Sequence, residues 1–232
     1  ADSDTDCAAQ AVSLCAQGKA NFLMKGILGT ADLMRAVFNK EQGLRTSHLT
    51  THCMFYEIPA LGKMLILTDG GVNTFPDLEK KAEILENAAA VLQALGYTSI
   101  NAACICGAEQ VNPKVQSTVD ADALSKMTDR WAKYNMQVCG PVALDLAVSK
   151  EACKHKHFTA PGAGDADILL VPNYEGGNGI GKAASLFGNA KNAGIILGAK
   201  VPIVLVSRAD SAESKLASIA AGSVLAQRME LN

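Results

Sequence analysis

A glycine-rich stretch around Lys182 has the residue types and the spacing to bind an anion. Gly176, Gly181 and Lys182 match the pattern G-x-x-x-x-G-K, after an apolar run and before a helical pattern. A nucleotide-binding P-loop needs Ser or Thr at the next position to hold Mg²⁺, and here that residue is Ala183. The backbone N–H groups and the lysine still suit a phosphate or another anion. The alternative is that the glycines only form a tight turn and that the Lys182 ammonium is solvated.

A second polar pair, Ser207 and Arg208, directly follows another apolar, strand-like run. Asn178 and Lys182 likewise come shortly after the strand-like run 167–171. In parallel α/β sheets, ligands bind at the carboxyl ends of strands. We therefore expect both pairs to lie at ligand-binding edges of a sheet.

Helix-like and strand-like patterns alternate along the whole chain. The strand-like runs are 21–24, 49–58, 64–68, 100–106, 136–139, 167–171, 193–197 and 201–206. The helical patterns are 6–17, 31–39, 77–95, 120–134, 141–154, 182–187 and 212–229. The segment 173–181 has four glycines and no apolar period, which predicts a loop. The alternation predicts the α/β class with a largely parallel sheet.

Composition indicates a globular protein of one or two domains. The 232 residues are 49% hydrophobic and 19% charged. The net charge of −2 provides no bulk attraction to nucleic acid or to anionic membranes. The apolar runs are far shorter than a membrane span, and no signal peptide is visible. The seven cysteines contain no C-x-x-C and lie mostly in apolar segments, which indicates reduced thiols in a cytoplasmic protein.

The histidines form no recognisable metal motif. His48 and His52 are four residues apart, as zinc ligands on a helix would be. Their segment is strand-like, however, and residues four apart on a strand are separated by about 13 Å. His155 and His157 fall in an expected surface loop, and no H-E-x-x-H is present. The sequence therefore predicts no metal site.

Several long stretches resemble the phosphate acyltransferases, the family of phosphate acetyltransferase and phosphate butyryltransferase. YEGGNGIGK is similar to the family's E-A-G-N-x-x-x-K, and LGAKVPIVLVSRADSAESKLASIA is similar to its C-terminal end. KGILGTADLMRAVFNKEQGLRT, LILTDGGVN and PDLEKKAEILENA also resemble the family, most closely its butyryltransferase branch. The resemblance runs from about Ala8 to Ala226. Family members begin with an additional α/β segment, so we expect these 232 residues alone to be poorly active.

This resemblance implies a fold and a reaction. The implied fold has two three-layer α/β domains with a cleft between them, similar to isocitrate and isopropylmalate dehydrogenases. Domain I would comprise residues 1–46 and 195–232, and domain II residues 47–194. The implied reaction converts acyl-CoA and inorganic phosphate into a short-chain acyl phosphate and coenzyme A, with a butyryl or acetyl group. The resemblance also implies a cytoplasmic homodimer that uses coenzyme A as a substrate and holds no permanent cofactor or metal.

Catalytic roles for Ser207 and Arg208 follow from the same resemblance. In the acetyltransferases, a base aspartate lies seven residues after this serine. That position is Ser214 here, and the adjacent Glu213 is our candidate for the base. An equally weighted interpretation of Glu213 is a first-turn helix acid that the helix dipole stabilises.

The residues implied to bind substrate are Lys25, Arg35, Gly177, Asn178 and Lys182. Arg35 lies in a stretch similar to A-D-x-x-R-P, in which the family's arginine meets the substrate phosphate, although Ala36 replaces the proline. Without the resemblance, Lys25 and Arg35 would be interpreted as solvated surface charges. Two other functions stay open, a P-loop-like nucleotide-binding protein and a non-catalytic relative that binds phosphate or coenzyme A.

Overall fold

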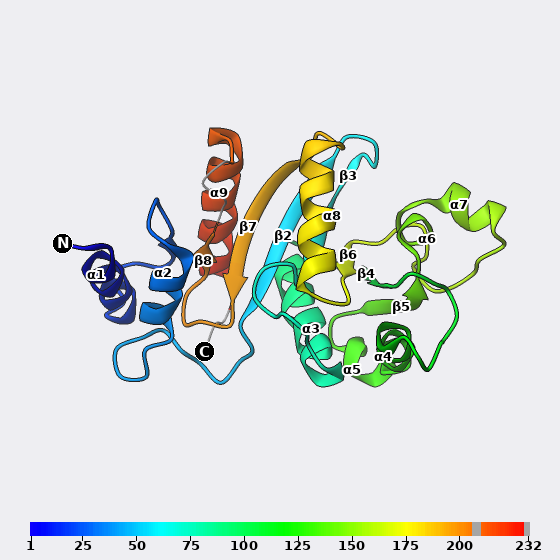
Figure 1. The fold of residues 1–232 in the computed structure, drawn as a ribbon, viewed down its shortest axis with the longest axis horizontal. Coiled ribbons are helices and arrows are strands. Elements are labelled where there is room, and N and C mark those ends of the chain that lie inside the picture. The colour runs from blue at the N-terminus through cyan, green and yellow to red at the C-terminus, as the bar shows by residue number, and fades with distance from the viewer. Residues whose placement is uncertain (206–209, 230–232) are drawn as a thin grey trace. The chain divides into compact units, whose positions relative to one another are not determined.

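A computed structural model gives the fold of the chain, and it describes residues 1–205 and 210–229. The predicted residues Ser207 and Arg208 lie outside this part. The chain has a mixed α/β fold, in which helices and strands alternate along the sequence (Figure 1). It divides into two compact units, which are Ala1–Thr50 with Asn192–Asn232 (unit 1) and Thr51–Lys191 (unit 2).

In unit 1, strand β8 lies between β1 and β7 in the sheet. Strand β1 (Leu23–Met24) pairs in parallel with β8 (Ile203–Val204). Strand β8 pairs antiparallel with β7 (Lys191–Leu197). The helices of this unit are α1 (Asp4–Ala16), α2 (Thr30–Val37) and α9 (Ala212–Arg228).

Helix α9 packs closely on this sheet because it is rich in small residues. The Ser211 side chain caps its N-terminus by accepting from the backbone N–H of Ser214. A Cβ atom on Gly222 would lie 2.6 Å from Val204 Cγ2, so only glycine fits there. The Ser218 hydroxyl accepts from the Gly194 N–H at 3.1 Å. The expected small-residue helix at 212–229 is therefore confirmed.

The sheet of unit 2 is mostly parallel, as predicted. Its strand order is β2, β3, β6, β4 and β5. Strands β2 and β3 form an antiparallel hairpin, and the other neighbours pair in parallel. The strands are β2 (Thr51–Ile58), β3 (Lys63–Thr68), β4 (Ile100–Ile105), β5 (Met136–Val142) and β6 (Ile168–Leu170).

Helices cover both faces of this sheet. Successive side chains of a strand point to opposite faces, so one strand can contact helices on both sides. On one face, Leu67 and Leu169 pack with side chains of α6 and α8. On the other face, Cys104 and Leu170 lie against α3 and α4. Figure 1 shows α8 in front of β2 and β3. The helices of unit 2 are α3 (Leu78–Ala94), α4 (Gln116–Ser125), α5 (Thr128–Ala132), α6 (Leu144–Val148), α7 (Lys150–His155) and α8 (Tyr174–Leu186).

Two predicted helices are divided in the structure. The predicted helix 120–134 is α4 followed by α5, and the indole N–H of Trp131 donates to the Leu124 carbonyl near the end of α4. The predicted helix 141–154 is wrong at its start, because β5 continues to Val142. Strand β5 is an edge strand of the sheet, and a proline such as Pro141 is tolerated in an edge strand. The Ser149 side chain then caps a separate helix, α7.

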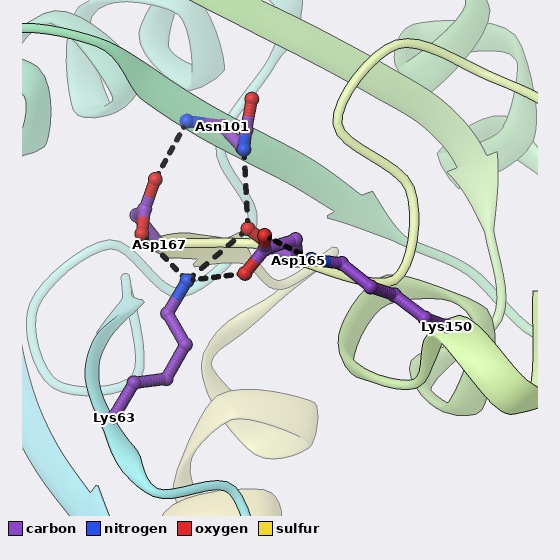
Figure 2. A network of polar contacts seen from close by, with 5 residues as sticks. All are labelled: Lys63, Asn101, Lys150, Asp165 and Asp167. Atoms are coloured by element: carbon purple, nitrogen blue, oxygen red, sulfur yellow. Dashed lines mark hydrogen bonds and ion pairs between the residues drawn. The ribbon is translucent and has the colours of Figure 1, made fainter.

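An ion-pair network joins the amino ends of three neighbouring strands (Figure 2). The Lys63 ammonium contacts the Asp167 carboxylate at 2.7 Å and the Asp165 carboxylate at 3.0 Å. Lys150 contacts the other Asp165 oxygen at 2.7 Å. The backbone N–H of Asn101 donates to Asp167 at 2.9 Å. The network therefore ties β3, β4 and the segment before β6 together at the edge opposite their carboxyl ends.

We expect the network to make stability depend on pH in the acid range. The Lys150 and Lys63 ammoniums lower the pKa of the Asp165 carboxyl. A carboxyl with a lowered folded pKa stabilises the protein above its unfolded pKa of about 3.9, and this contribution is lost as the pH falls through the folded pKa. Asp165→Asn should therefore lower the Tm at pH 7, and the difference from the parent should shrink below pH 4 or so.

A suitable control for this experiment is Glu57→Gln. Glu57 is an exposed carboxylate on β2 that is in none of the ion pairs of the described residues. Its substitution makes the same change in charge and should leave the Tm nearly unchanged at both pH values. Equal effects of the two substitutions would show that the network does not stabilise the sheet.

Candidate functional site

The glycine-rich segment is helical, so its prediction as a loop is wrong. Helix α8 begins at Tyr174, and the Asn173 side chain caps it by accepting from the Gly176 N–H at 2.9 Å. Glycine inside a helix costs about 1 kcal/mol relative to alanine, which is why the sequence favoured a loop. Contacts with distant parts of unit 2 explain why glycine is present.

Two of these glycines let α8 lie directly on its neighbours. A Cβ atom on Gly177 would lie 2.7 Å from the Cα atom of Gly70 and 2.7 Å from Val171 Cγ2. A Cβ atom on Gly181, one turn later, would overlap the Tyr56 hydroxyl. Both glycines are buried. The tertiary packing therefore requires glycine at these positions and outweighs its low helix propensity.

Asn178 and Lys182 are exposed and lie one helical turn apart on α8. Residues four apart on a helix are neighbours on its surface. The Lys182 ammonium is in none of the ion pairs found within residues 1–205 and 210–229. An exposed amide and an unneutralised ammonium side by side can bind an anionic group. The structure thus brings three predicted residues, Gly177, Asn178 and Lys182, together on one helix.

The turn after β3 holds the N-terminal end of α8. Asp69 is buried at this turn, and its carboxylate accepts from the backbone N–H groups of His52, Gly71 and Val72 at 2.8 to 3.1 Å. It also accepts from the Asn73 side chain at 2.7 Å. Four donors on one carboxylate fix the conformation of the turn.

This turn is bonded directly to α8. The backbone N–H of Tyr174 donates to the Thr74 carbonyl at 3.0 Å, and Gly70 lies against Gly177 as described above. Sequence reasoning missed Asp69 and the Gly70 contact, because both act through tertiary contacts. The only signal was the pair of glycines after an aspartate at the end of a strand.

Lys25 belongs to unit 1 and is buried, so its interpretation as a solvated charge is wrong. Its ammonium donates to the carbonyl oxygens of Gly26 at 3.0 Å and Leu28 at 3.2 Å. The backbone N–H of Lys25 donates to Val204 of β8. Lys25 therefore holds the loop between β1 and α2, which leads to the segment that contains Arg35.

Arg35 and Glu213 are exposed residues of unit 1. The Arg35 side chain is 69% exposed and contacts Asp32 at 2.8 Å, one turn earlier on α2. An exposed pair of this kind contributes about 0–1 kcal/mol, so an anion can compete for the guanidinium. Glu213 lies in the first turn of α9, where the helix dipole favours an acid. The neighbouring Ser214 is buried and its N–H is part of the helix cap.

Three buried cysteines of unit 2, Cys53, Cys104 and Cys106, are poor nucleophiles. Burial raises the pKa of the Cys53 thiol to about 12 and raises the pKa of Cys104 and Cys106 as well. Cys104 lines a small pocket beside Lys81, whose ammonium contacts the buried Asp120 carboxylate at 2.6 Å. Since the thiolate is the reactive form, these residues do not suit nucleophilic catalysis at neutral pH.

The described residues give no sign of a metal centre or a membrane span. No group of three His, Cys, Asp or Glu side chains in the described ranges could hold a metal ion. None of the described helices has the length and apolar character needed to cross a bilayer.

Comparisons with known proteins agree with one another. Residues 3–222 match the Phosphate acetyl/butaryl transferase family. The chain is 45% identical over 219 residues to the phosphate butyryltransferase of Clostridium acetobutylicum. This alignment covers 94% of this chain and 73% of that protein. It is 41% identical over 221 residues to the phosphate acetyltransferase of Rhizobium meliloti, covering 95% of this chain and 70% of that protein.

A solved structure is similar over nearly the whole chain. It is the crystal structure of a branched-chain phosphotransacylase from Enterococcus faecalis V583. Its TM-score is 0.91 at 39% sequence identity, and the match covers 99% of this chain and 82% of that one. Helix and strand positions are therefore shared with a phosphotransacylase, not only short motifs.

Proposed function

Because the chain belongs to the Phosphate acetyl/butaryl transferase family, we propose that it transfers a short-chain acyl group between coenzyme A and inorganic phosphate. The observation that carries this proposal is the 45% identity to a phosphate butyryltransferase over 94% of the chain. The products in one direction are an acyl phosphate and coenzyme A. The acyl group is butyryl or acetyl, since relatives named for both substrates match.

The nucleotide-binding alternative is not favoured. A P-loop surrounds phosphates with the free backbone N–H groups of a loop, and its next residue is Ser or Thr. Here Gly176 and Gly181 lie within helix α8, and Ala183 provides no hydroxyl for Mg²⁺. Backbone N–H groups beyond the first turn of a helix are already bonded to carbonyl groups of the preceding turn. They are therefore not free to surround a phosphate.

The reaction needs a thiolate and donors for negative charge. Towards acyl-CoA, the coenzyme A thiol loses a proton and its sulfur attacks the acyl carbon, while phosphate leaves. A general base contributes about 10²–10⁴-fold to such a step. An oxyanion forms at the acyl oxygen, and cationic or N–H donors stabilise it. The buried protein thiols described above do not suit this role, so the nucleophile is the substrate's own sulfur.

We propose the following roles for the predicted site residues. Arg208 and Arg35 hold phosphate oxygens, since a planar guanidinium can bind two oxygens at once. Ser207 hydrogen-bonds the thiol or the phosphate, and Glu213 is the candidate base.

In unit 2, Gly177 places α8 on its neighbours so that Asn178 and Lys182 bind an anionic part of a substrate. Lys25, whose ammonium donates to the Leu28 carbonyl in the loop before α2, also binds the substrate.

We propose that the chain forms two three-layer α/β domains like those of isocitrate and isopropylmalate dehydrogenases, with residues 1–46 plus 195–232 in one domain and residues 47–194 in the other. We also propose a cytoplasmic homodimer without a permanent cofactor. Coenzyme A, inorganic phosphate and a short-chain acyl phosphate are the proposed ligands.

We expect Lys182→Ala to raise the KM for coenzyme A or for phosphate about tenfold, the value of one charged hydrogen bond. The effect should weaken at high salt, because the site is exposed. A matched control is Lys154→Ala. Lys154 is an exposed lysine on α7 of the same unit, and it is in none of the ion pairs of the described residues. Steady-state kinetics at low and high salt make the comparison. Unchanged kinetics at low salt would make Lys182 a solvated surface charge.

An assay of thiol release tests the proposed function. Butyryl-CoA and inorganic phosphate are incubated with the full-length protein, and free coenzyme A is measured with a thiol reagent. We expect release that depends on both the protein and phosphate. Release that is independent of phosphate would indicate a thioesterase, and binding without release would indicate a non-catalytic relative.

A further inference from the structure

His52 is a buried histidine whose ring has no hydrogen-bond partner in the described part of the chain. The residue lies on β2 and is 7% exposed. Neither Nδ1 nor Nε2 has a partner among residues 1–205 and 210–229. Burial of a polar group without a hydrogen-bond partner destabilises the folded protein. Such a group in a native structure therefore calls for an explanation, and function is one of them.

The His52 ring packs on the turn that holds α8. A Cβ atom on Gly71 would overlap the ring at Nδ1, so the imidazole lies directly over the Gly71 backbone. The backbone N–H of His52 is also one of the four donors to the Asp69 carboxylate. The same turn accepts the hydrogen bond from Tyr174 at the start of α8. His52 therefore contacts both the backbone of the turn and the carboxylate that fixes it.

We propose that His52 is a positioning residue whose neutral ring keeps the Asp69–Thr74 turn in place beneath α8 and whose protonation releases it. The inference that this affects substrate binding rests on the proposed function, because Asn178 and Lys182 lie on α8. The inference that protonation opens the turn does not depend on that function. The ring acts through the turn and α8, without touching a substrate.

Protonation of the ring disturbs the turn for a simple reason. A neutral imidazole can pack in a dry site, whereas an imidazolium has two donors and a charge that need partners. Among the described residues, Asp69 is the charged group that acts on the ring, and its oxygens already accept from four donors. An imidazolium therefore competes with Gly71, Val72 and Asn73 for this carboxylate.

The neighbouring groups support a neutral ring in the folded protein. Burial lowers the pKa of His52, and this outweighs the Asp69 charge, which raises it. The adjacent Cys53 thiol stays neutral, because burial raises its pKa to about 12. A histidine with a folded pKa below its unfolded value of about 6.5 destabilises the folded state as the pH falls through the interval between the two. The turn should therefore loosen on the acid side of neutrality.

The test compares the parent protein with His52→Phe between pH 7.5 and pH 5.5. Phenylalanine keeps an aromatic ring but cannot take up a proton. We expect amide hydrogen exchange of residues 69–74 and of the first turn of α8, corrected for the intrinsic effect of pH, to increase at pH 5.5 in the parent only. The KM for coenzyme A should rise at least threefold on the same acidification in the parent and stay constant in the variant.

His155→Gln is the matched control, because it removes an exposed imidazole on α7 of the same unit. It should keep the parent's pH response. If His52→Phe does not fold, His52→Gln replaces it, since glutamine is also neutral at both pH values. A parent and a His52 variant with the same pH response in exchange would overturn the proposal.

Amide hydrogen exchange tests whether the turn opens, and the KM for coenzyme A tests whether this opening affects substrate binding. A pH-dependent exchange difference with a constant KM would make His52 a purely structural residue and would overturn its positioning role. A pH-dependent exchange difference in a protein without acyl transfer would refute the proposed function and leave the opening of the turn in place. A pH response of both exchange and KM that is lost in the variant supports the whole proposal.

Discussion

Arg208→Ala should lower turnover by about 10²–10³, the cost of losing one donor to a developing oxyanion. The net charge of the chain is −2, so no general positive field attracts an anionic acyl phosphate. Local groups must bind it. A guanidinium holds two oxygens in one plane, which an ammonium cannot reproduce, so Arg208→Lys should recover only part of the activity.

A structural ion pair is the rival role for Arg208, and it predicts the opposite pattern. The Tm would fall while turnover per folded molecule stayed intact. Our proposal predicts a nearly constant Tm, and measuring both quantities on Arg208→Ala and Arg208→Lys decides between the two roles. Lys19→Ala is the control and should change neither quantity, because it removes an exposed cation of unit 1 that is in none of the ion pairs of the described residues.

Gly177→Ala should destabilise the protein and impair the site together. The added methyl would meet the Gly70 backbone and Val171 Cγ2, both at 2.7 Å, and a backbone atom cannot rotate away. Overpacking of this kind costs about 1–3 kcal/mol. Helix α8 must then move outward with Asn178 and Lys182, and a displacement of about 1 Å in a site can cost 10²-fold in rate. Thermal unfolding and kinetics measure the two effects.

Gly179→Ala is a matched control two residues along the same helix. A Cβ atom on Gly179 would meet no other atom within 4 Å. Alanine is the better helix former by about 1 kcal/mol, so this variant should be at least as stable as the parent. If Gly177→Ala were equally stable and equally active, the close contact between α8 and the turn after β3 would not matter for the site.

The sequence predicted elements well where local pattern and tertiary structure agree. Helix α3 was expected over 77–95 because apolar residues recur at helical spacing, and Ala82, Leu85, Ala89 and Leu92 are all buried on it. The parallel pairing of β3, β4 and β6 followed from the alternation of helices and strands. No tertiary information was needed for these elements.

Sequence prediction failed where tertiary contacts outweigh local preference. The first half of helix α8 was predicted as a loop because its glycines have low helix propensity, and Gly70, which requires one of them, lies more than 100 residues earlier. Without the family resemblance, Lys25 would be interpreted as a solvated charge, and the two carbonyl groups that accept from its ammonium are not evident from the sequence pattern. His52 was considered only as a metal ligand, since no sequence pattern reports that a ring is dry and unpaired.

In the candidate site, too, local spacing could be predicted from the sequence and tertiary contacts could not. Asn178 and Lys182 are one turn apart on an exposed helix surface, which the spacing alone would give once the segment is known to be helical. Asp69 could not be assigned a role from sequence, because two of its four donors are backbone N–H groups of the turn and a third is the backbone N–H of His52 on β2. The catalytic roles of Ser207 and Arg208 follow from the family resemblance of the segment LVSRADS.

The central claim is that phosphate accepts the acyl group, and the ratio of acyl phosphate formed to thiol released measures this most directly. The full-length protein is incubated with butyryl-CoA and inorganic phosphate. Acyl phosphate is trapped with hydroxylamine as the hydroxamate, while free coenzyme A is followed in the same samples. We predict one acyl phosphate for each thiol and no thiol release without phosphate. Thiol release without acyl phosphate, or no reaction with either butyryl-CoA or acetyl-CoA, would contradict the account.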